Sequence, residues 1–242
     1  MIENTRNYKV LFLGKITSVI NLPNTKSIKG SYTLFPRSGL YSQIFKTLRF
    51  KHYSGERRWI NKIGLRNPGI DYGIKHYNHK SDILSIAIME KKEINEFLKK
   101  IPEDTNLEIN ISCPNTDKNM VNKGIHVFLN PKRKWCIIKL SPTIDTSLID
   151  SYYRQGFRQF HCSNTLPSKY GGISGTILIP YTKNLIKYIS KNYNDTTIIA
   201  GGGIYDLKIL NEYKMCGANH FSLSTIFFNP LKTFSFFSNI YF

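Results

Sequence analysis

The stretch Leu107-Glu-Ile-Asn-Ile-Ser-Cys-Pro-Asn115 begins with alternating apolar residues and breaks at Pro114. Alternation with a period of two predicts a β-strand, and proline ends it. Two amides and the thiol of Cys113 are therefore expected together at the carboxyl end of a strand. In α/β proteins, ligands and chemistry are found at such ends. By itself, the stretch leaves Cys113 open as a nucleophile, a base or an inert strand-end residue.

Seven further segments, most of them largely apolar, are strand candidates, and segments with helical or turn patterns separate most of them. They are Val10–Leu13, Ser27–Leu34, Ile83–Met89, Trp135–Leu140, Gln159–Cys162, Thr196–Ala200 and Asn219–Leu223. Apolar strands alternating with helices are typical of a parallel sheet that is covered on both faces. Eight such units in 242 residues favour a closed barrel over an open sheet. The sequence therefore predicts an α/β fold, a single (β/α)8 TIM barrel over residues 1–242 that is compact, with trimmed loops.

The helices expected between these strands begin at Asp71, cover Lys91–Lys100 and Asp145–Gln155, run from Gly175 to about Tyr193, cover Leu207–Cys216 and close the chain. Two segments lack a regular period. Phe35–Trp59 is expected to be a long loop that could hold a hairpin, and Gly171–Gly175 is expected to be a glycine loop.

The charge balance of 34 Lys and Arg against 16 Asp and Glu gives a net charge of +18. Such a charge attracts nucleic acid, anionic membranes or anionic substrates. The alternative is an excess of lysine on solvated helix faces, because the basic residues are scattered and form no dense tail. Charge alone therefore does not indicate a nucleic-acid partner, although it does not exclude one.

The four cysteines form no C-x-x-C pair, and no histidine stands at zinc spacing, so no metal site is expected. Free cysteines favour a reducing compartment. The first residues carry no signal-peptide core, and no apolar run approaches the roughly 20 residues that cross a bilayer. A soluble, cytoplasmic protein is the expectation.

Small residues end the last two strand candidates, where Gly202 and Gly203 follow one and Ser224 and Thr225 follow the other. They would let backbone N–H groups approach a phosphate at the position that recurs in barrels. Glycine is also required by ordinary tight turns, which is the alternative. A Rossmann dinucleotide site is not supported, because no G-x-G-x-x-G follows the first strand.

Lys139 is the only charge in its strand, near the carboxyl end. A buried charge needs a partner, because leaving it desolvated and alone costs several kcal/mol. An anionic ligand or cofactor is the favoured partner, and an ion pair with Glu108 is the alternative. Four amides also stand at strand ends or loops: Asn61, Asn110, Asn115 and Asn164. Together they suggest hydrogen bonding to a flat polar molecule, although any one of them could cap a turn.

Cys113 has no neighbouring histidine in the sequence, so a protease-like dyad is unsupported. His161, at another strand end, is a candidate neighbour in space. A thiol can also act as a base toward a carbon acid when a cofactor accepts the hydride.

These residues stand in an order that resembles one family, the dihydroorotate dehydrogenases, in its soluble class 1 form. The matching motifs are Asn61-Lys-Ile-Gly-Leu-Arg-Asn67, Asn110-Ile-Ser-Cys-Pro-Asn115, Ile138-Lys-Leu-Ser-Pro142, Ser163-Asn-Thr165, Gly171-Gly-Ile-Ser-Gly175, Ile199-Ala-Gly-Gly-Gly-Ile204, and Gly217-Ala with Ser224-Thr225. The resemblance implies a flavoprotein of pyrimidine biosynthesis that oxidises dihydroorotate to orotate. It also implies a homodimer and an electron acceptor such as fumarate.

The resemblance implies FMN as the cofactor, with Lys139 beside the flavin ring and the phosphate on Gly202, Gly203, Ser224 and Thr225. Lys29, Ser31, Asn110, Ser163 and Gly175 would also line the flavin site. Asn61, Gly64, Leu65, Asn110, Asn115, Asn164 and Thr165 would hold the pyrimidine ring and its carboxylate. Cys113 would take the proton from C5 while C6 gives a hydride to flavin N5.

Two other functions remain as alternatives. A tRNA-dihydrouridine synthase is also a basic FMN barrel with an Asn-x-x-Cys-Pro motif. Asn115, the Lys139-Leu-Ser-Pro142 strand and the lack of a carboxy-terminal helical RNA domain argue against it. The third reading is a degenerate barrel that binds flavin or RNA without turnover.

Overall fold

The structure is a computed structural model that describes residues 11–13, 24–53, 56–111 and 124–241. Cys113 and Asn115 lie outside these ranges. Within them, eight parallel strands pair side by side as β1-β12-β11-β8-β7-β6-β5-β2, and pairing of β1 with β2 closes the ring. Their bounds are β1 Leu11–Leu13, β2 Thr25–Tyr32, β5 Asp82–Ile86, β6 Leu107–Asn110, β7 Cys136–Leu140, β8 Gln159–Cys162, β11 Thr197–Gly201 and β12 His220–Leu223. Each of the eight strands expected from the apolar runs is present.

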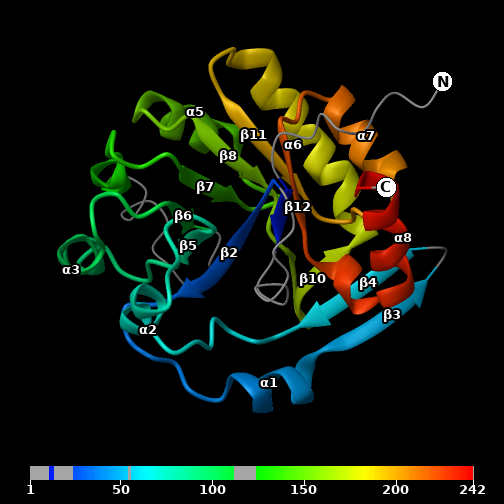
Figure 1. Ribbon diagram of the computed structural model, residues 1–242, viewed down its shortest axis with the longest axis horizontal. Coiled ribbons are helices and arrows are strands. Elements are labelled where there is room, and N and C mark those ends of the chain that lie inside the picture. The colour runs from blue at the N-terminus through cyan, green and yellow to red at the C-terminus, as the bar shows by residue number, and fades with distance from the viewer. Residues whose placement is uncertain (1–10, 14–23, 54–55, 112–123, 242) are drawn as a thin grey trace.

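Helices lie outside the ring, and Figure 1 shows α6, α7 and α8 on the right and α2, α3 and α5 on the left. Their bounds are α2 Ile70–Lys75, α3 Glu93–Lys100, α5 Thr146–Arg154, α6 Ile179–Asn192, α7 Leu207–Met215 and α8 Pro230–Tyr241. The α/β class is confirmed. Eight complete strand–helix units are not, because a 3-10 turn at Ile125–Phe128 is the only helical element described between β6 and β7. The complete (β/α)8 arrangement therefore stays a prediction.

The strands bury two different faces, as their period of two requires. The outward face carries residues such as Leu84, Ile138 and Phe160, which pack against the helices in one large apolar cluster. The inward face starts with Ile28, Ile83, Ile137 and Ile199, which form a smaller cluster with Trp135. Cys136 and Cys162 belong to the outward cluster. They are small buried hydrophobes, as free cysteines in protein cores usually are.

On three strands, the inward-facing residue two positions after the isoleucine is polar or small instead of apolar. Ser85 follows Ile83, Lys139 follows Ile137, and Gly201 follows Ile199. The ring is thus closed at one level by isoleucine side chains and opens above them into a polar layer at the carboxyl ends. This polar layer is where a ligand site can form.

A second, antiparallel sheet was not foreseen. It has the order β3-β4-β10-β9, with β3 Arg49–Tyr53, β4 Glu56–Asn61, β9 Leu166–Ser168 and β10 Gly171–Gly175. The expected loop Phe35–Trp59 holds helix α1 (Leu40–Thr47), which was not expected, and most of the β3–β4 hairpin, which the sequence left open. The expected glycine loop Gly171–Gly175 is strand β10, because it pairs with β4 and β9 on its two sides.

This sheet belongs to the connections that leave the carboxyl ends of β2 and β8, so it lies at the mouth of the ring, at the bottom of Figure 1. Trp59 of β4 contacts Phe228 after β12, with ring centroids 4.4 Å apart. In the described part of the chain, no helix is long and apolar enough to cross a membrane.

Candidate active site

A cavity opens at the carboxyl ends of the strands, and its walls enclose about 530 Å³ of empty space, mouth included. Four strands contribute its walls, together with Ser174 of the antiparallel sheet. The lining residues are Lys139, His161, Ser163, Asn164, Thr165, Ser174, Leu178, Gly201, Gly202, Gly203, Ile204, Ser222, Ser224 and Thr225.

One wall of the cavity is the glycine turn after β11. Gly202 and Gly203 have φ angles of 90° and 74°, a backbone region that favours glycine. A Cβ on Gly202 would lie 2.8 Å from Leu178, and a Cβ on Gly203 would lie 2.8 Å from Ile179. Tyr213 of α7 donates a hydrogen bond to the carbonyl of Gly202 at 2.7 Å, which fixes the turn. Glycine is therefore needed at both positions for the turn to pack against Leu178 and Ile179, and the turn lines the cavity.

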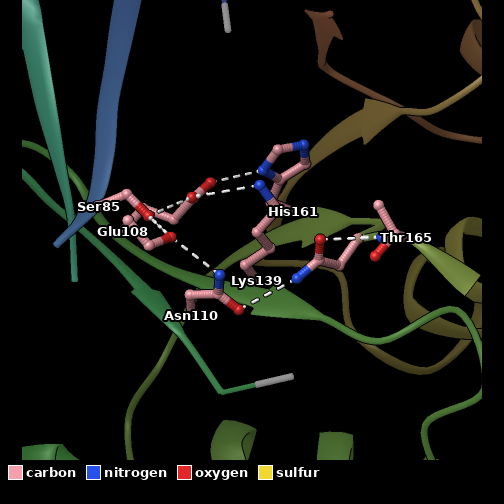
Figure 2. A network of polar contacts seen from close by, with 8 residues as sticks. Ser85, Glu108, Asn110, Lys139, His161 and Thr165 are labelled. Atoms are coloured by element: carbon pink, nitrogen blue, oxygen red, sulfur yellow. Dashed lines mark hydrogen bonds and ion pairs between the residues drawn. The ribbon is translucent and has the colours of Figure 1, made fainter. Parts of the chain in front are cut away.

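Beneath the cavity, the side chain of Glu108 is completely buried and joins three strands (Figure 2). Its Oε1 accepts a hydrogen bond from Ser85 Oγ at 2.8 Å and lies 3.5 Å from Lys139 Nζ. Its Oε2 lies 2.6 Å from His161 Nδ1. The ion pair that the sequence left as the alternative for Lys139 is therefore present, while Lys139 also lines the cavity.

The charges in this cluster follow from its burial. Burial alone would raise the pKa of Glu108, but the positive charge of Lys139 and the contact with His161 outweigh it and lower the pKa to about 2. Burial, followed by the charge of Lys139, lowers the pKa of His161. At neutral pH the cluster thus holds an ionised Glu108, a charged Lys139 and a neutral His161.

The predicted amides form a second chain of contacts beside this cluster. Asn164 Nδ2 donates to Asn110 Oδ1 at 3.1 Å, and Asn110 Nδ2 donates to Ser31 Oγ at 2.9 Å. The hydroxyls of Ser31 and Ser85 lie 2.8 Å apart, which links this chain to Glu108. A shift of register between Lys29 and Tyr32 brings Ser31 to this position. Residues of β2, β6 and the end of β8 are therefore held in one arrangement (Figure 2).

Eight of the predicted site residues line the cavity together: Lys139, Ser163, Asn164, Thr165, Gly202, Gly203, Ser224 and Thr225. Asn110 and Ser31 join them through hydrogen bonds. Gly175 lies beside the glycine turn, because its carbonyl oxygen would be 3.0 Å from a Cβ on Gly203.

The remaining predictions fall elsewhere. Lys29 is turned to the outer face of the sheet, where its Nζ pairs with Asp82 at 2.7 Å and donates to the carbonyl of His76. Its register partner Leu84 is part of the outward core, so a place for Lys29 in the flavin site was wrong. Asn61 is the last residue of β4, and Gly64 and Leu65 follow it, all outside the cavity lining. Gly64 and Leu65 both have positive φ, as a tight turn requires.

Ser85 and Ser174 were not foreseen as part of the site. A signal for Ser85 was available, since it has the phase of the inward face two residues after Ile83. Ser174 gave no such signal, because its place depends on the pairing of β10 with β4.

The lining suits a flat ligand with a phosphate or another anionic group. It holds one cation, Lys139, and no carboxylate among the described residues. The glycine turn, with Ser224 and Thr225, offers small residues and hydroxyls at one wall. No group of three or more side chains that could hold a metal ion occurs in the described ranges.

Comparison with known proteins finds similar chains among the catalytic subunits of one bacterial enzyme. The catalytic subunit of dihydroorotate dehydrogenase B (NAD(+)) from Petrotoga mobilis is 28% identical over 205 residues, covering 71% of this chain and 68% of the relative. The same subunit from Malacoplasma penetrans is 28% identical over 206 residues, covering 71% and 67%. The chain is thus similar in sequence to catalytic subunits of dihydroorotate dehydrogenase B over about 70% of its length. No family model matches it.

A solved dihydroorotate dehydrogenase, that of Eimeria tenella in complex with ferulenol, has a similar fold. Its TM-score is 0.60 at 17% identity, over 84% of this chain and 70% of that one. The resemblance to the dihydroorotate dehydrogenases that the motifs predicted is therefore confirmed in sequence and in fold.

Proposed function

We propose that the chain is an FMN-dependent oxidoreductase that converts dihydroorotate to orotate. The observation that carries this proposal is the single cavity that brings together eight residues expected at a flavin and pyrimidine site, in a relative of the dihydroorotate dehydrogenases.

The residues present fit FMN on two grounds. The glycine turn at Gly202 and Gly203 allows a phosphate to approach the backbone, and Ser224 and Thr225 add hydroxyl donors beside it. Lys139 supplies the one positive charge of the described lining, which suits a ring that gains negative charge on reduction. When bound, the flavin would supply the hydride acceptor.

The pyrimidine would be held by Asn110, Asn164 and Thr165. Thr165 N donates to Asn164 Oδ1 at 2.8 Å, and Asn164 donates in turn to Asn110. Because these contacts fix both amides, the two side chains can face a flat polar ring with little loss of entropy. Asn61, Gly64, Leu65 and Asn115 complete the proposed substrate site, with Cys113 as the base that removes the C5 proton.

The test is an anaerobic titration. The purified protein should carry a visible flavin spectrum, and dihydroorotate should bleach it. A colourless protein that binds tRNA would exclude this function and favour one of the two alternatives.

Replacement of the proposed base gives a sharper prediction. Cys113→Ala should leave the flavin bound but slow its reduction by dihydroorotate about 100-fold or more, the usual effect of losing a general base. Stopped-flow absorbance of the bound flavin measures this rate. Cys216→Ala is the matched control, since Cys216 follows α7 and is not part of the described cavity lining. Equal rates in the two variants would show that Cys113 is not the base.

A further inference from the structure

Glu108 is a buried carboxylate that the proposed function does not use. It has no exposed surface, and both of its oxygens are occupied, by Ser85 and Lys139 on one side and by His161 on the other. A buried charge of this kind costs several kcal/mol of desolvation unless its partners are well placed. Its position directly under the cavity calls for a reason beyond packing.

The contact of Glu108 with His161 defines where the proton of the imidazole lies. Oε2 and Nδ1 are 2.6 Å apart, a distance that requires a proton between them. Since Glu108 is ionised and His161 is neutral, Nδ1 carries that proton and Nε2 carries none. Nε2 is on the side of Gly201, where an added Cβ would lie 2.8 Å from it. Glycine at this position makes room for the ring.

The contact of Glu108 with Lys139 is looser. The ammonium lies 3.5 Å from Oε1, and the side chain of Lys139 is 20% exposed toward the cavity. An ammonium has three donors, so this one can keep its counter-ion and still donate to a ligand. The other described side chains that extend this network, Ser31, Ser85 and Asn110, are uncharged. The ammonium that Lys139 presents to the cavity is therefore already paired with the carboxylate of Glu108.

We propose that Glu108 and His161 are positioning residues that set the place and the effective charge of Lys139 at the cofactor site. This role rests on the flavin binding proposed above. With the carboxylate in place, the floor of the cavity attracts negative charge less strongly than a bare ammonium would. The pair would thus hold the flavin's reduction potential below the value that Lys139 alone would give.

Glu108→Gln tests this role, because it keeps the shape of the side chain and removes its charge. The reduced flavin carries more negative charge, so it should gain about tenfold in stability relative to the oxidised form. That is a rise of about 30 mV in a two-electron potential. Glu108→Asp, which retains the charge, should stay nearer to the unchanged protein. Glu103→Gln is the control. Glu103 precedes β6 and pairs with Lys132 on the surface, so its replacement should leave the potential unchanged.

Nitrogen NMR of the flavin-free protein gives an independent readout. The ring of His161, assigned by comparison with His161→Gln, should carry its proton on Nδ1 from about pH 6 to 8, and Glu108→Gln should alter its signals. A bare Nδ1 in the unchanged protein would overturn the proposal, even if Glu108→Gln does not fold.

The outcomes separate this inference from the proposed function. A bound flavin whose potential is the same in Glu108→Gln and Glu103→Gln overturns the positioning role and leaves the function intact. A protein that binds no flavin overturns the function and with it the role of Glu108 toward a flavin, while NMR still decides whether Glu108 orients His161.

Discussion

At the scale of single residues, Gly203 is constrained by its backbone and by its neighbours. Gly203 and Gly64 have similar φ angles of 74° and 67°, but a Cβ on Gly203 would meet Ile179 at 2.8 Å whereas the nearest atom to one on Gly64 is 4.0 Å away. Gly64→Ala should cost about 1 kcal/mol of unfolding free energy from backbone strain alone. Gly203→Ala should cost about 3 kcal/mol or more, because the turn must also move. Urea denaturation of both variants measures the difference, and equal losses would contradict the clash.

Lys139 and Lys29 show how much of a side chain's surroundings can be predicted from the sequence. A charge inside an apolar strand predicted that Lys139 must be paired, and it is. The sequence could not choose between Glu108 and a ligand, because both lie on the same inward face of the ring. Lys29 was misplaced for a local reason. It is one residue out of phase with Ile28, and the shift of register that returns Ser31 to the inside comes only after it.

At the scale of elements, helices α6 and α1 should differ in what they contribute to stability. Thr182, Leu185, Ile186 and Ile189 of α6 are buried, whereas α1 has no buried residue and exposes Phe45 by 83%. Ile186→Ala should cost about 2–5 kcal/mol, because it leaves a cavity in the outward core. Phe45→Ala should change stability by less than about 0.5 kcal/mol. Chemical denaturation of the two variants gives the comparison, and a large loss from Phe45→Ala would mean that α1 is packed against something further.

The same contrast explains which elements the sequence predicted. Most of the ring strands are short and largely apolar, so composition marks them, although β2 also carries two lysines. β10 is Gly171-Gly-Ile-Ser-Gly175, with three glycines that disfavour a strand. It forms because β4 and β9 supply hydrogen-bond partners on both sides, and such long-range pairing leaves no local period to detect. Since Ser174 of β10 lines the cavity, the missed sheet is also a missed wall of the site.

At the scale of the whole molecule, the closed ring of strands sets the distances between the sequence motifs, which the sequence alone does not give. Asn110, Lys139 and His161 are far apart in the chain, yet they lie on adjacent strands in register: Asn110 opposite Lys139, and Lys139 opposite His161. The order of the strands and the residues that face inward can each be predicted from the sequence, and together they imply that these three side chains are close. The hydrogen-bond partners of each side chain could not be, because they depend on the register of three strands at once.

Glu108 ties this neighbourhood to the stability of the whole fold. Its pKa of about 2 lies below its ordinary value of 4.5, so its contribution is present above about pH 4.5 and lost as the pH falls toward 2. That shift corresponds to a contribution on the order of 3 kcal/mol. The lowered pKa of His161 acts in the same direction, because below about pH 6.5 the unfolded chain takes a proton that the native ring resists.

Comparison with Glu108→Gln isolates the carboxylate, since other acidic groups are common to both proteins and their effects cancel. Urea denaturation at about pH 7, 5 and 3 should show the unchanged protein losing stability faster than the variant below about pH 4.5. The gap between them should therefore narrow as the pH falls. A gap that stays constant to about pH 3 would mean that Glu108 titrates alike in the folded and unfolded chain. In that case Lys139 and His161 would not stabilise the ionised form of Glu108.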